Sequence, residues 1–252
     1  PELKIGFEYD SIAWHSENFG NKDKNYHLNK QNYAASKGIQ LYFIRSNEWS
    51  EKKSIVKSII NAKFHYNVNK IFARKCIVKE IDNFESENFL NKNHIQGNGK
   101  ASIKIGVYYN NELVSVITLA KARFNKNYEY ELIRFANKLN TSVIGGFNKM
   151  ISYFIKKYNP KSIITYSDKR LFKGDIYKNA GFTYLYDSAP NYVYVKDKAI
   201  AGSRIEFQKH KLRNKLENFN ENLTESENMF NNGYDKLWDC GNKVYELKNN
   251  SL

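Results

Sequence analysis

The sequence predicts an α/β (α+β) protein. Segments with the alternating apolar pattern of strands are interleaved with segments that have the spacing of amphipathic helices. The 252 residues are enough for two ordinary domains, each with its own core. We therefore expect an N-terminal unit at residues 1–65, a mixed-sheet domain at 71–198, and a basic C-terminal extension with a helix and a hairpin at 199–252.

The N-terminal unit is predicted to contain two strands and two helices. Alternating β-forming residues predict strands at 3–9 and 39–44. Apolar residues at helical spacing predict helices at 26–37 and 50–62. The polar, irregular segment 63–70 is placed as the boundary with the next domain.

The same two patterns alternate along the second domain. Strands are expected at 71–78, 102–109, 113–120, 128–135, 162–167, 182–186 and 191–195, and helices at 83–92, 147–158 and 171–180. The extension is expected to form a helix at 223–227 and a hairpin at 238–247. This order of elements predicts a single domain built around a mixed sheet.

The composition favours a polyanionic partner. Forty Lys and Arg against 26 Asp and Glu leave a net charge of +14, which suits nucleic acid or an anionic membrane surface. No apolar run approaches the roughly 18–20 residues of a membrane span, so no membrane partner is expected. Cys76 and Cys240 are too few for a disulfide framework or a cysteine-based zinc site. We expect a cytoplasmic protein with reduced thiols.

Acidic and histidine side chains gather near the start of the chain. Glu8 and Asp10 lie two residues apart at a predicted strand end and therefore point to the same face. Such a carboxylate pair suits Mg²⁺ (or Mn²⁺) beside a phosphate. His15, and His27 at the start of the next helix, could act as general acid or base. The alternative is that the carboxylates are solvated and the histidine packs at the rim of a core.

The blocks Phe-Glu-Tyr-Asp, Trp-His-Ser-Glu and Tyr-His-Leu-Asn-Lys in the first thirty residues resemble phage homing endonucleases of the Vsr-like (very-short-patch repair) branch of the restriction-endonuclease fold. The resemblance covers about sixty residues. It implies that His15 is the nuclease histidine, that Glu8 and Asp10 form the acidic strand end, and that His27 is a further active-site residue. It also implies a truncated, N-terminally incomplete nuclease unit, whose principal metal-binding aspartate would lie upstream of Pro1. A phage-encoded protein would act in the host cell cytoplasm.

Two glycines open a predicted helix in the second domain. Backbone amides at a helix start such as Gly145-Gly146 can hold a phosphate group, although glycines often serve only a tight turn. Residues 71–196 resemble the GNAT acetyltransferase fold, with 177–182 similar to its Tyr-x-x-x-Gly-Phe ending. Only half of the family's Arg/Gln-x-x-Gly-x-Gly/Ala loop is present, so acetyl-CoA binding is expected to be unlikely and the domain to be an accessory one.

Positive charge is concentrated in residues 146–215, which contain fifteen Lys and Arg but only five Asp and Glu. Basic residues interleaved with aromatic ones suit contacts with double-stranded DNA. The candidate DNA-binding residues are Lys169, Arg170, Lys173, Lys196, Lys198, Arg204, Lys209, Lys211 and Arg213.

Three functions remain open from the sequence. The leading hypothesis is a site-specific, Mg²⁺-dependent DNA endonuclease of phage homing type, acting as a monomer or homodimer. The second is an acyl-CoA-dependent N-acetyltransferase that uses Gly145 and Gly146. The third is a DNA-binding fragment without catalytic activity.

Overall fold

The computed structural model describes residues 2–249, which form two compact units built from interleaved segments. The first, called here the N-terminal unit, combines the residues up to Glu51 with Asp168–Phe172 and Ser188–Asn242. The second, called the sheet unit, combines Lys52–Ser167, Lys173–Asp187 and the residues from Lys243 onward. The division into three consecutive parts that the sequence suggests stays a prediction.

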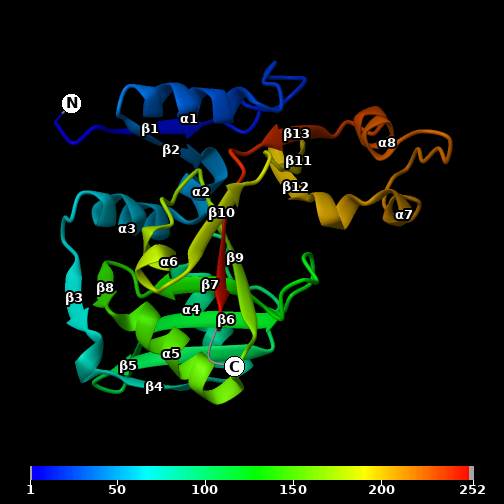
Figure 1. The fold of residues 1–252 in the computed structure, drawn as a ribbon. Helices are drawn as coiled ribbons and strands as arrows, with labels where there is room; N and C mark the ends of the chain where they lie inside the picture. Colours follow the sequence, from blue (N-terminus) through cyan, green and yellow to red (C-terminus); the bar gives the residue numbers. More distant parts are fainter. Residues whose placement is uncertain (1, 250–252) are drawn as a thin grey trace. The chain divides into compact units, whose positions relative to one another are not determined.

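A seven-stranded sheet forms the framework of the sheet unit (Figure 1). Its strands, in spatial order, are β10 (Thr183–Asp187), β14 (Asn242–Lys248), β9 (Ser162–Asp168), β7 (Tyr130–Asn137), β6 (Glu112–Lys121), β5 (Ile103–Tyr109) and β4 (Ile77–Glu80). The pairs from β4 to β7 are antiparallel, whereas β7 and β9 are parallel. The expected mixed α/β fold is therefore confirmed.

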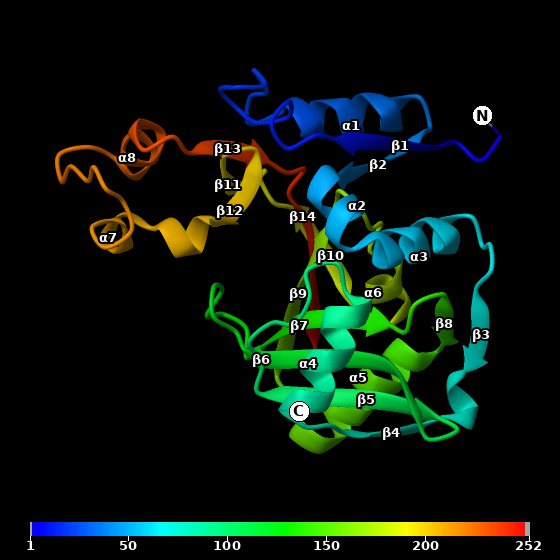
Figure 2. The ribbon, with the colours of Figure 1, turned by 180° about the vertical axis from the view of Figure 1, so that it is seen from behind.

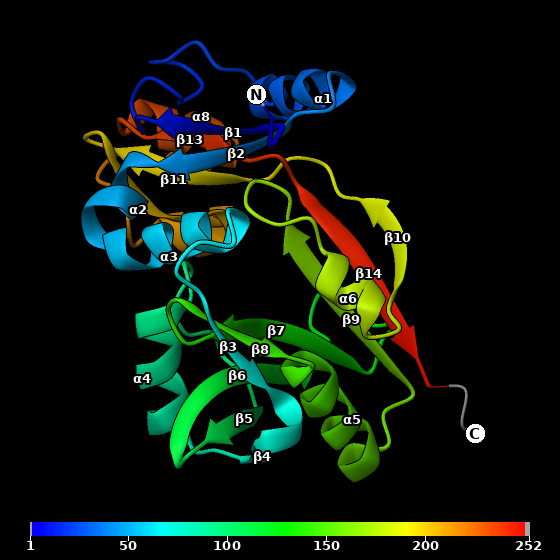
Figure 3. The same cartoon turned by 90° about the vertical axis from the view of Figure 1, so that its left-hand side faces the viewer.

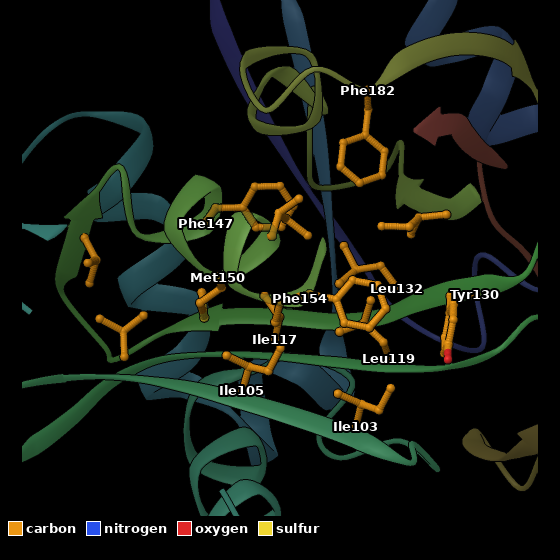
Figure 4. Packing of buried hydrophobic residues seen from close by; sticks show 14 of the residues in the cluster. Ile103, Ile105, Ile117, Leu119, Tyr130, Leu132, Phe147, Met150, Phe154 and Phe182 are labelled. Carbon is orange, nitrogen blue, oxygen red and sulfur yellow. The ribbon is translucent and has the colours of Figure 1, made fainter. Parts of the chain in front are cut away.

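Two helices cover opposite faces of this sheet, as the front and rear views show (Figures 1 and 2). Helix α5 (Gly146–Tyr158) packs Phe147, Met150 and Phe154 against the face that includes Ile117 (Figure 4). Helix α4 (Asn83–Asn93) packs Phe89 and Leu90 against Val116 on the other face. Because successive strand residues point to opposite faces, the neighbours Val116 and Ile117 serve two separate cores.

Smaller elements complete the sheet unit. They are α3 (Lys53–Lys63), α6 (Asp175–Asn179), the short helix η1 (Ala73–Lys75), and a parallel pair formed by β3 (Asn69–Phe72) and β8 (Thr141–Ile144). The single strand expected at 71–78 is wrong, because η1 interrupts it. The helix expected at 171–180 is shorter, because Gly174 has a φ of +83° and precedes α6 as its N-cap.

The N-terminal unit contains two further sheets. Strands β1 (Ile5–Asp10) and β2 (Gln40–Arg45) are parallel and are joined through α1 (Tyr26–Ser36). The other sheet has the order β12 (Ala199–Ser203), β11 (Tyr192–Lys196), β13 (Asp235–Trp238). The unit also holds α2 (Ser46–Glu51), η2 (Arg204–Phe207), α7 (Lys209–Leu212) and α8 (Glu225–Asn231).

Two other sequence-based expectations are corrected by these elements. The hairpin expected at 238–247 does not form, because β13 pairs with β11 while β14 pairs with β10. The single helix expected at 50–62 is divided between α2 and α3. No helix within residues 2–249 is long and apolar enough to cross a membrane.

His94, at the C-terminal end of α4, is expected to make the sheet unit sensitive to acid. Its Nδ1 accepts a hydrogen bond from the Gln96 N–H at 3.1 Å. Burial, followed by the charges of Arg134 and Lys52, lowers the pKa of His94 to about 3. The unfolded chain therefore binds a proton below pH ~6.5 that the folded chain excludes, and stability is lost as pH falls from that value toward 3.

We expect this histidine to lower the free energy of unfolding by up to about 2 kcal/mol between pH 7 and pH 5. His94→Gln should lose that part of the pH dependence in urea titrations followed by circular dichroism. His210→Gln, which changes an exposed histidine, should retain it. Equal pH dependence in both variants would contradict the assignment.

Candidate active site

Strands β7 and β9 pair over three residues and then separate. The register runs from Tyr130 opposite Ile163 to Leu132 opposite Thr165 and ends there, although β7 continues to Asn137 and β9 to Asp168. Figure 3 shows the two strands diverging from this point. We call this place the β7–β9 fork. Parallel strands that separate leave backbone groups at their carboxyl ends unpaired with each other, which is where α/β sheets commonly bind ligands.

Tyr177 of α6 lies at the fork. A side-chain hydrogen bond joins it to Thr165, which is 1% exposed, and the charge of Arg134 on β7 is close enough to act on it. Burial raises the pKa of Tyr177 above its usual range, although Thr165 and Arg134 act in the opposite direction. The phenol is therefore protonated at neutral pH and can donate a proton.

A buried carboxyl group lies on β7, on the face opposite the α5 core. Glu131 is 7% exposed and precedes Leu132, so its side chain points away from the α5 core that contains Leu132. Burial raises the pKa of Glu131, while contacts with Arg123 and the charge of Arg134 lower it. A carboxylate whose pKa is raised toward neutrality is a better general base than a solvated one.

Gly145 and Gly146 form the start of α5, and glycine is needed at each position for a different reason. Gly145 has a φ of +77°, a left-handed conformation that glycine adopts without strain. A Cβ on Gly146 would lie 2.6 Å from Val143 Cγ1. No side chain caps this helix and its first turn carries no acidic residue. The free N–H groups of this turn are therefore suited to an anion.

We expect Gly146→Ala to destabilise the protein by about 1–3 kcal/mol, because the added methyl group overpacks against a buried valine. Urea unfolding at neutral pH measures the effect. Gly20 is not a suitable control, since it too approaches backbone atoms closely, whereas a Cβ on Gly233 would meet nothing nearer than 4.0 Å. Gly233→Asn, which tolerates a positive φ, should therefore cost less than Gly146→Ala.

The structure brings together three of the four predicted nuclease residues, all within the N-terminal unit. His15 Nδ1 lies 3.0 Å from His27 Nε2 and 3.3 Å from Asp10 Oδ1. Glu8 instead forms an ion pair with Lys30 at 2.5 Å. Burial raises the pKa of Asp10 to about 7 and lowers that of His27 to about 3, and it also lowers the pKa of His15.

Arg170 is buried and therefore does not face a ligand at the surface. Its guanidinium donates to both oxygens of Glu48 at 2.7 Å and to the Phe43 carbonyl at 2.9 Å. It also pairs with Asp168 at 3.4 Å. Burial alone would raise the pKa of Glu48, but the charge and hydrogen bonds of Arg170 hold it below its usual range.

The remaining predicted DNA-binding residues are distributed over both units. Lys173 belongs to the sheet unit and the others to the N-terminal unit. Several already interact within the chain: Lys209 and Lys211 donate to backbone carbonyls, and Arg213 pairs with Glu221. The exposed residues Lys196, Lys198 and Arg204, and the partly buried Lys169, stay predicted DNA contacts.

Sequence reasoning assigned no role to Glu131, Thr165 or Tyr177. Tyr177 is visible in the sequence as the first residue of Tyr-x-x-x-Gly-Phe, which marks it as a candidate. Its position beside Thr165 depends on how the chain folds back after β9 to form α6, and no local sequence pattern shows this.

No known protein-family profile and no curated protein matches this sequence. Similar solved structures do exist. An acetyltransferase from Bacillus subtilis, in complex with CoA, has 14% identity and a TM-score of 0.38, covering 69% of this chain and 98% of that one. The ribosomal-protein-S18-alanine N-acetyltransferase of Escherichia coli has 8% identity and a TM-score of 0.38, covering 70% and 98%. An aminoglycoside 6'-acetyltransferase has 12% identity and a TM-score of 0.37, covering 68% and 96%.

These matches correct the leading functional prediction. The three proteins are acetyltransferases, the fold that residues 71–196 resemble, and they are transferases rather than hydrolases. The predictions of a phage homing endonuclease and of Mg²⁺ (or Mn²⁺) as its cofactor are contradicted by this finding. The expectation that acetyl-CoA is unlikely is contradicted as well, because the Bacillus subtilis acetyltransferase holds CoA.

Proposed function

We propose that the sheet unit is an acyl-CoA-dependent N-acyltransferase whose reacting groups meet at the β7–β9 fork. The observation that carries the proposal is the fork itself, where pairing ends after Leu132 and Thr165 and a partly buried tyrosine lies beside Thr165. Helix α5, with its uncapped start, follows β8, the short strand that comes after β7. A thioester-bearing nucleotide needs both features: a place for its acyl end and a place for its phosphates.

The start of α5 fits the phosphate groups of a CoA. Its first N–H groups have no side-chain cap, and no acidic residue lies in its first turn. Gly145 has no side chain that would obstruct a phosphate group there. The helix dipole adds partial positive charge at the same place. These groups would hold the pyrophosphate, even though only half of the usual glycine loop is present in the sequence.

Two side chains supply the proton transfers. An acyl-CoA would supply an acyl group activated as a thioester, which an amine can attack. Glu131 is suited to take a proton from the attacking amine, because burial raises the pKa of its carboxyl group. Tyr177 is suited to give a proton to the departing sulfur, because its raised pKa keeps the phenol protonated at neutral pH. Two of the matched proteins are named for different acceptors, so the site supports a reaction class rather than one acceptor.

Calorimetry with acetyl-CoA tests the proposal. We expect binding at one site per chain, with ATP as a control nucleotide that binds more weakly. Asn148→Asp places a negative charge in the first turn of α5 and should weaken binding about tenfold or more. Asn127→Asp adds the same charge to an exposed loop and should leave binding unchanged. Absence of heat at millimolar acetyl-CoA would refute the proposal.

Acceptors are then tested with acetyl-CoA by the release of free thiol. An aminoglycoside and a peptide that begins with alanine are suitable first amines, since two of the matched proteins are named for such acceptors. A polyamine and a lysine peptide widen the range. We expect at least one primary amine to accelerate thiol release over the amine-free control.

A further inference from the structure

The N-terminal unit holds a cluster of ligating side chains that the acyl-transfer proposal does not use. We propose that Asp10, His15 and His27 bind one divalent transition-metal ion of the zinc type, through a carboxylate oxygen and two imidazole nitrogens. The three residues come from the end of β1, the turn that follows it, and the first turn of α1. The chain therefore brings them together from three separate local structures.

The distances between their ligand atoms match those around a tetrahedral metal. Zinc binds histidine nitrogen and carboxylate oxygen at about 2.0–2.2 Å, which places neighbouring ligands of a tetrahedron about 3.3–3.6 Å apart. Here His15 Nδ1 and His27 Nε2 are 3.0 Å apart, His15 Nδ1 lies 3.3 Å from Asp10 Oδ1, and His27 Nε2 lies 3.6 Å from the other carboxylate oxygen, Asp10 Oδ2. With a single oxygen taken from Asp10, the three ligand atoms all lie within 4.8 Å of one another. An ion could enter once the Asp10 carboxylate rotates to turn one oxygen toward both imidazoles.

Hydrogen bonds between the three side chains do not satisfy all of their buried polar atoms. The two imidazole nitrogens that face each other can share one proton, since each neutral ring carries only one N–H. Asp10 Oδ1 is buried and makes no hydrogen bond within the described residues. The side chains of Asp10 and His27 are each 3% exposed, so water does not satisfy them from the surface. A buried lone pair without a donor is costly, and a cation would remove that cost.

Two imidazole nitrogens and one carboxylate favour a transition metal over magnesium. Magnesium prefers oxygen ligands in an octahedron, whereas imidazole nitrogen suits zinc and its neighbours in the first transition row. The surrounding cations each have carboxylates beside them: Lys30 is paired with Glu8, and Arg170 with Glu48 and Asp168. The charges of Glu48 and Asp168 act on Arg45 as well.

A fourth position remains for water or another ligand. The side chain of His15 is 13% exposed, unlike those of Asp10 and His27, so this is the side from which the ion would be reached. No cysteine belongs to the cluster. Three protein ligands with one exchangeable position distinguish such a site from a closed structural zinc site with four protein ligands.

Metal content of the full chain, without an affinity tag and after stripping with a chelator, tests the proposal. We expect one Zn²⁺ or Co²⁺ per chain and a higher unfolding temperature with Zn²⁺ than with EDTA. The Co²⁺ form should show the strong visible absorption of four-coordinate cobalt without a thiolate charge-transfer band. His15→Gln and Asp10→Asn should each weaken Zn²⁺ binding by more than about 100-fold. Loss of a residue that only supports a metal ligand typically weakens binding by roughly 10–100-fold. His210→Gln changes an exposed histidine and should bind as the parent does.

Asp10→Asn keeps the shape of the side chain and removes a buried acid, so this variant is expected to fold, which circular dichroism verifies. The inference is overturned if the parent chain retains no Zn²⁺ or Co²⁺, or if folded Asp10→Asn binds as tightly as the parent. A thiolate band in the Co²⁺ form would also overturn it, because it would place the ion at Cys76 or Cys240. None of these results depends on acetyl-CoA, so the two proposals fail separately.

Discussion

Tyr177→Phe should lower the rate constant of acyl transfer by about 100-fold, the lower range for loss of a general acid. The substitution removes only the hydroxyl that bonds to Thr165 and keeps the ring in its core. Binding of acetyl-CoA should change little, because the phosphate site at α5 is untouched. The measurement is thiol release at saturating amine, together with the dissociation constant of acetyl-CoA from calorimetry.

The pH dependence of the acyl-transfer rate shows whether Tyr177 acts as the acid or only supports the structure. The acid must be protonated, so activity of the parent should fall as pH rises through the pKa of Tyr177, which burial places above the usual value for tyrosine. The phenylalanine variant should lack this alkaline limb. Tyr158→Phe removes a hydroxyl that bonds to Glu80 and should retain the parent rate and profile. If the two variants behave alike, Tyr177 is not the acid.

Arg170→Met should destabilise the N-terminal unit by about 3–5 kcal/mol, the usual cost of leaving a buried partner charge unpaired. Glu48 has a side chain that is 11% exposed and receives two hydrogen bonds from Arg170, so without them its carboxylate stays buried and uncompensated. The Phe43 carbonyl also loses a donor. Urea unfolding at pH 7 measures the loss.

A second substitution shows whether the unpaired charge of Glu48 causes the loss of stability in Arg170→Met. Glu48→Gln combined with Arg170→Met should recover a large part of the stability, because it removes the orphaned charge. Arg204→Met removes an exposed guanidinium and should cost within about 0.5 kcal/mol. If Arg204→Met destabilises as much as Arg170→Met, the buried pair is not the reason.

Elements with strong local patterns could be predicted from the sequence. The helices predicted at 83–92 and 147–158 correspond to α4 and α5 within one residue at each end, because apolar spacing and flanking turn residues define them locally. The expected 238–247 hairpin failed for the opposite reason. Its two strands have the right residue types, but each pairs with a partner distant in sequence. Strand pairing of that kind leaves no local signal.

The same distinction applies to the candidate sites. The meeting of Asp10, His15 and His27 could be anticipated, because a strand end, a turn and a helix start follow one another closely. The burial of Arg170 could not, since a lysine- and arginine-rich sequence looks the same whether a guanidinium faces solvent or Glu48. The β7–β9 fork was also invisible, because the point at which two strands stop pairing depends on geometry and not on residue type.

The order of synthesis has a consequence for the N-terminal unit. Ile12 packs with Val195 and Leu237, and the backbone N–H of Asn18 bonds to Asp235, so early residues find their partners late in the chain. Most of the sheet unit is made between them. A nascent chain that has not yet reached β13 must therefore keep Ile12 uncovered while its neighbours fold. During translation, the segment around Ile12 would stay accessible to chaperones and proteases until β13 has been made.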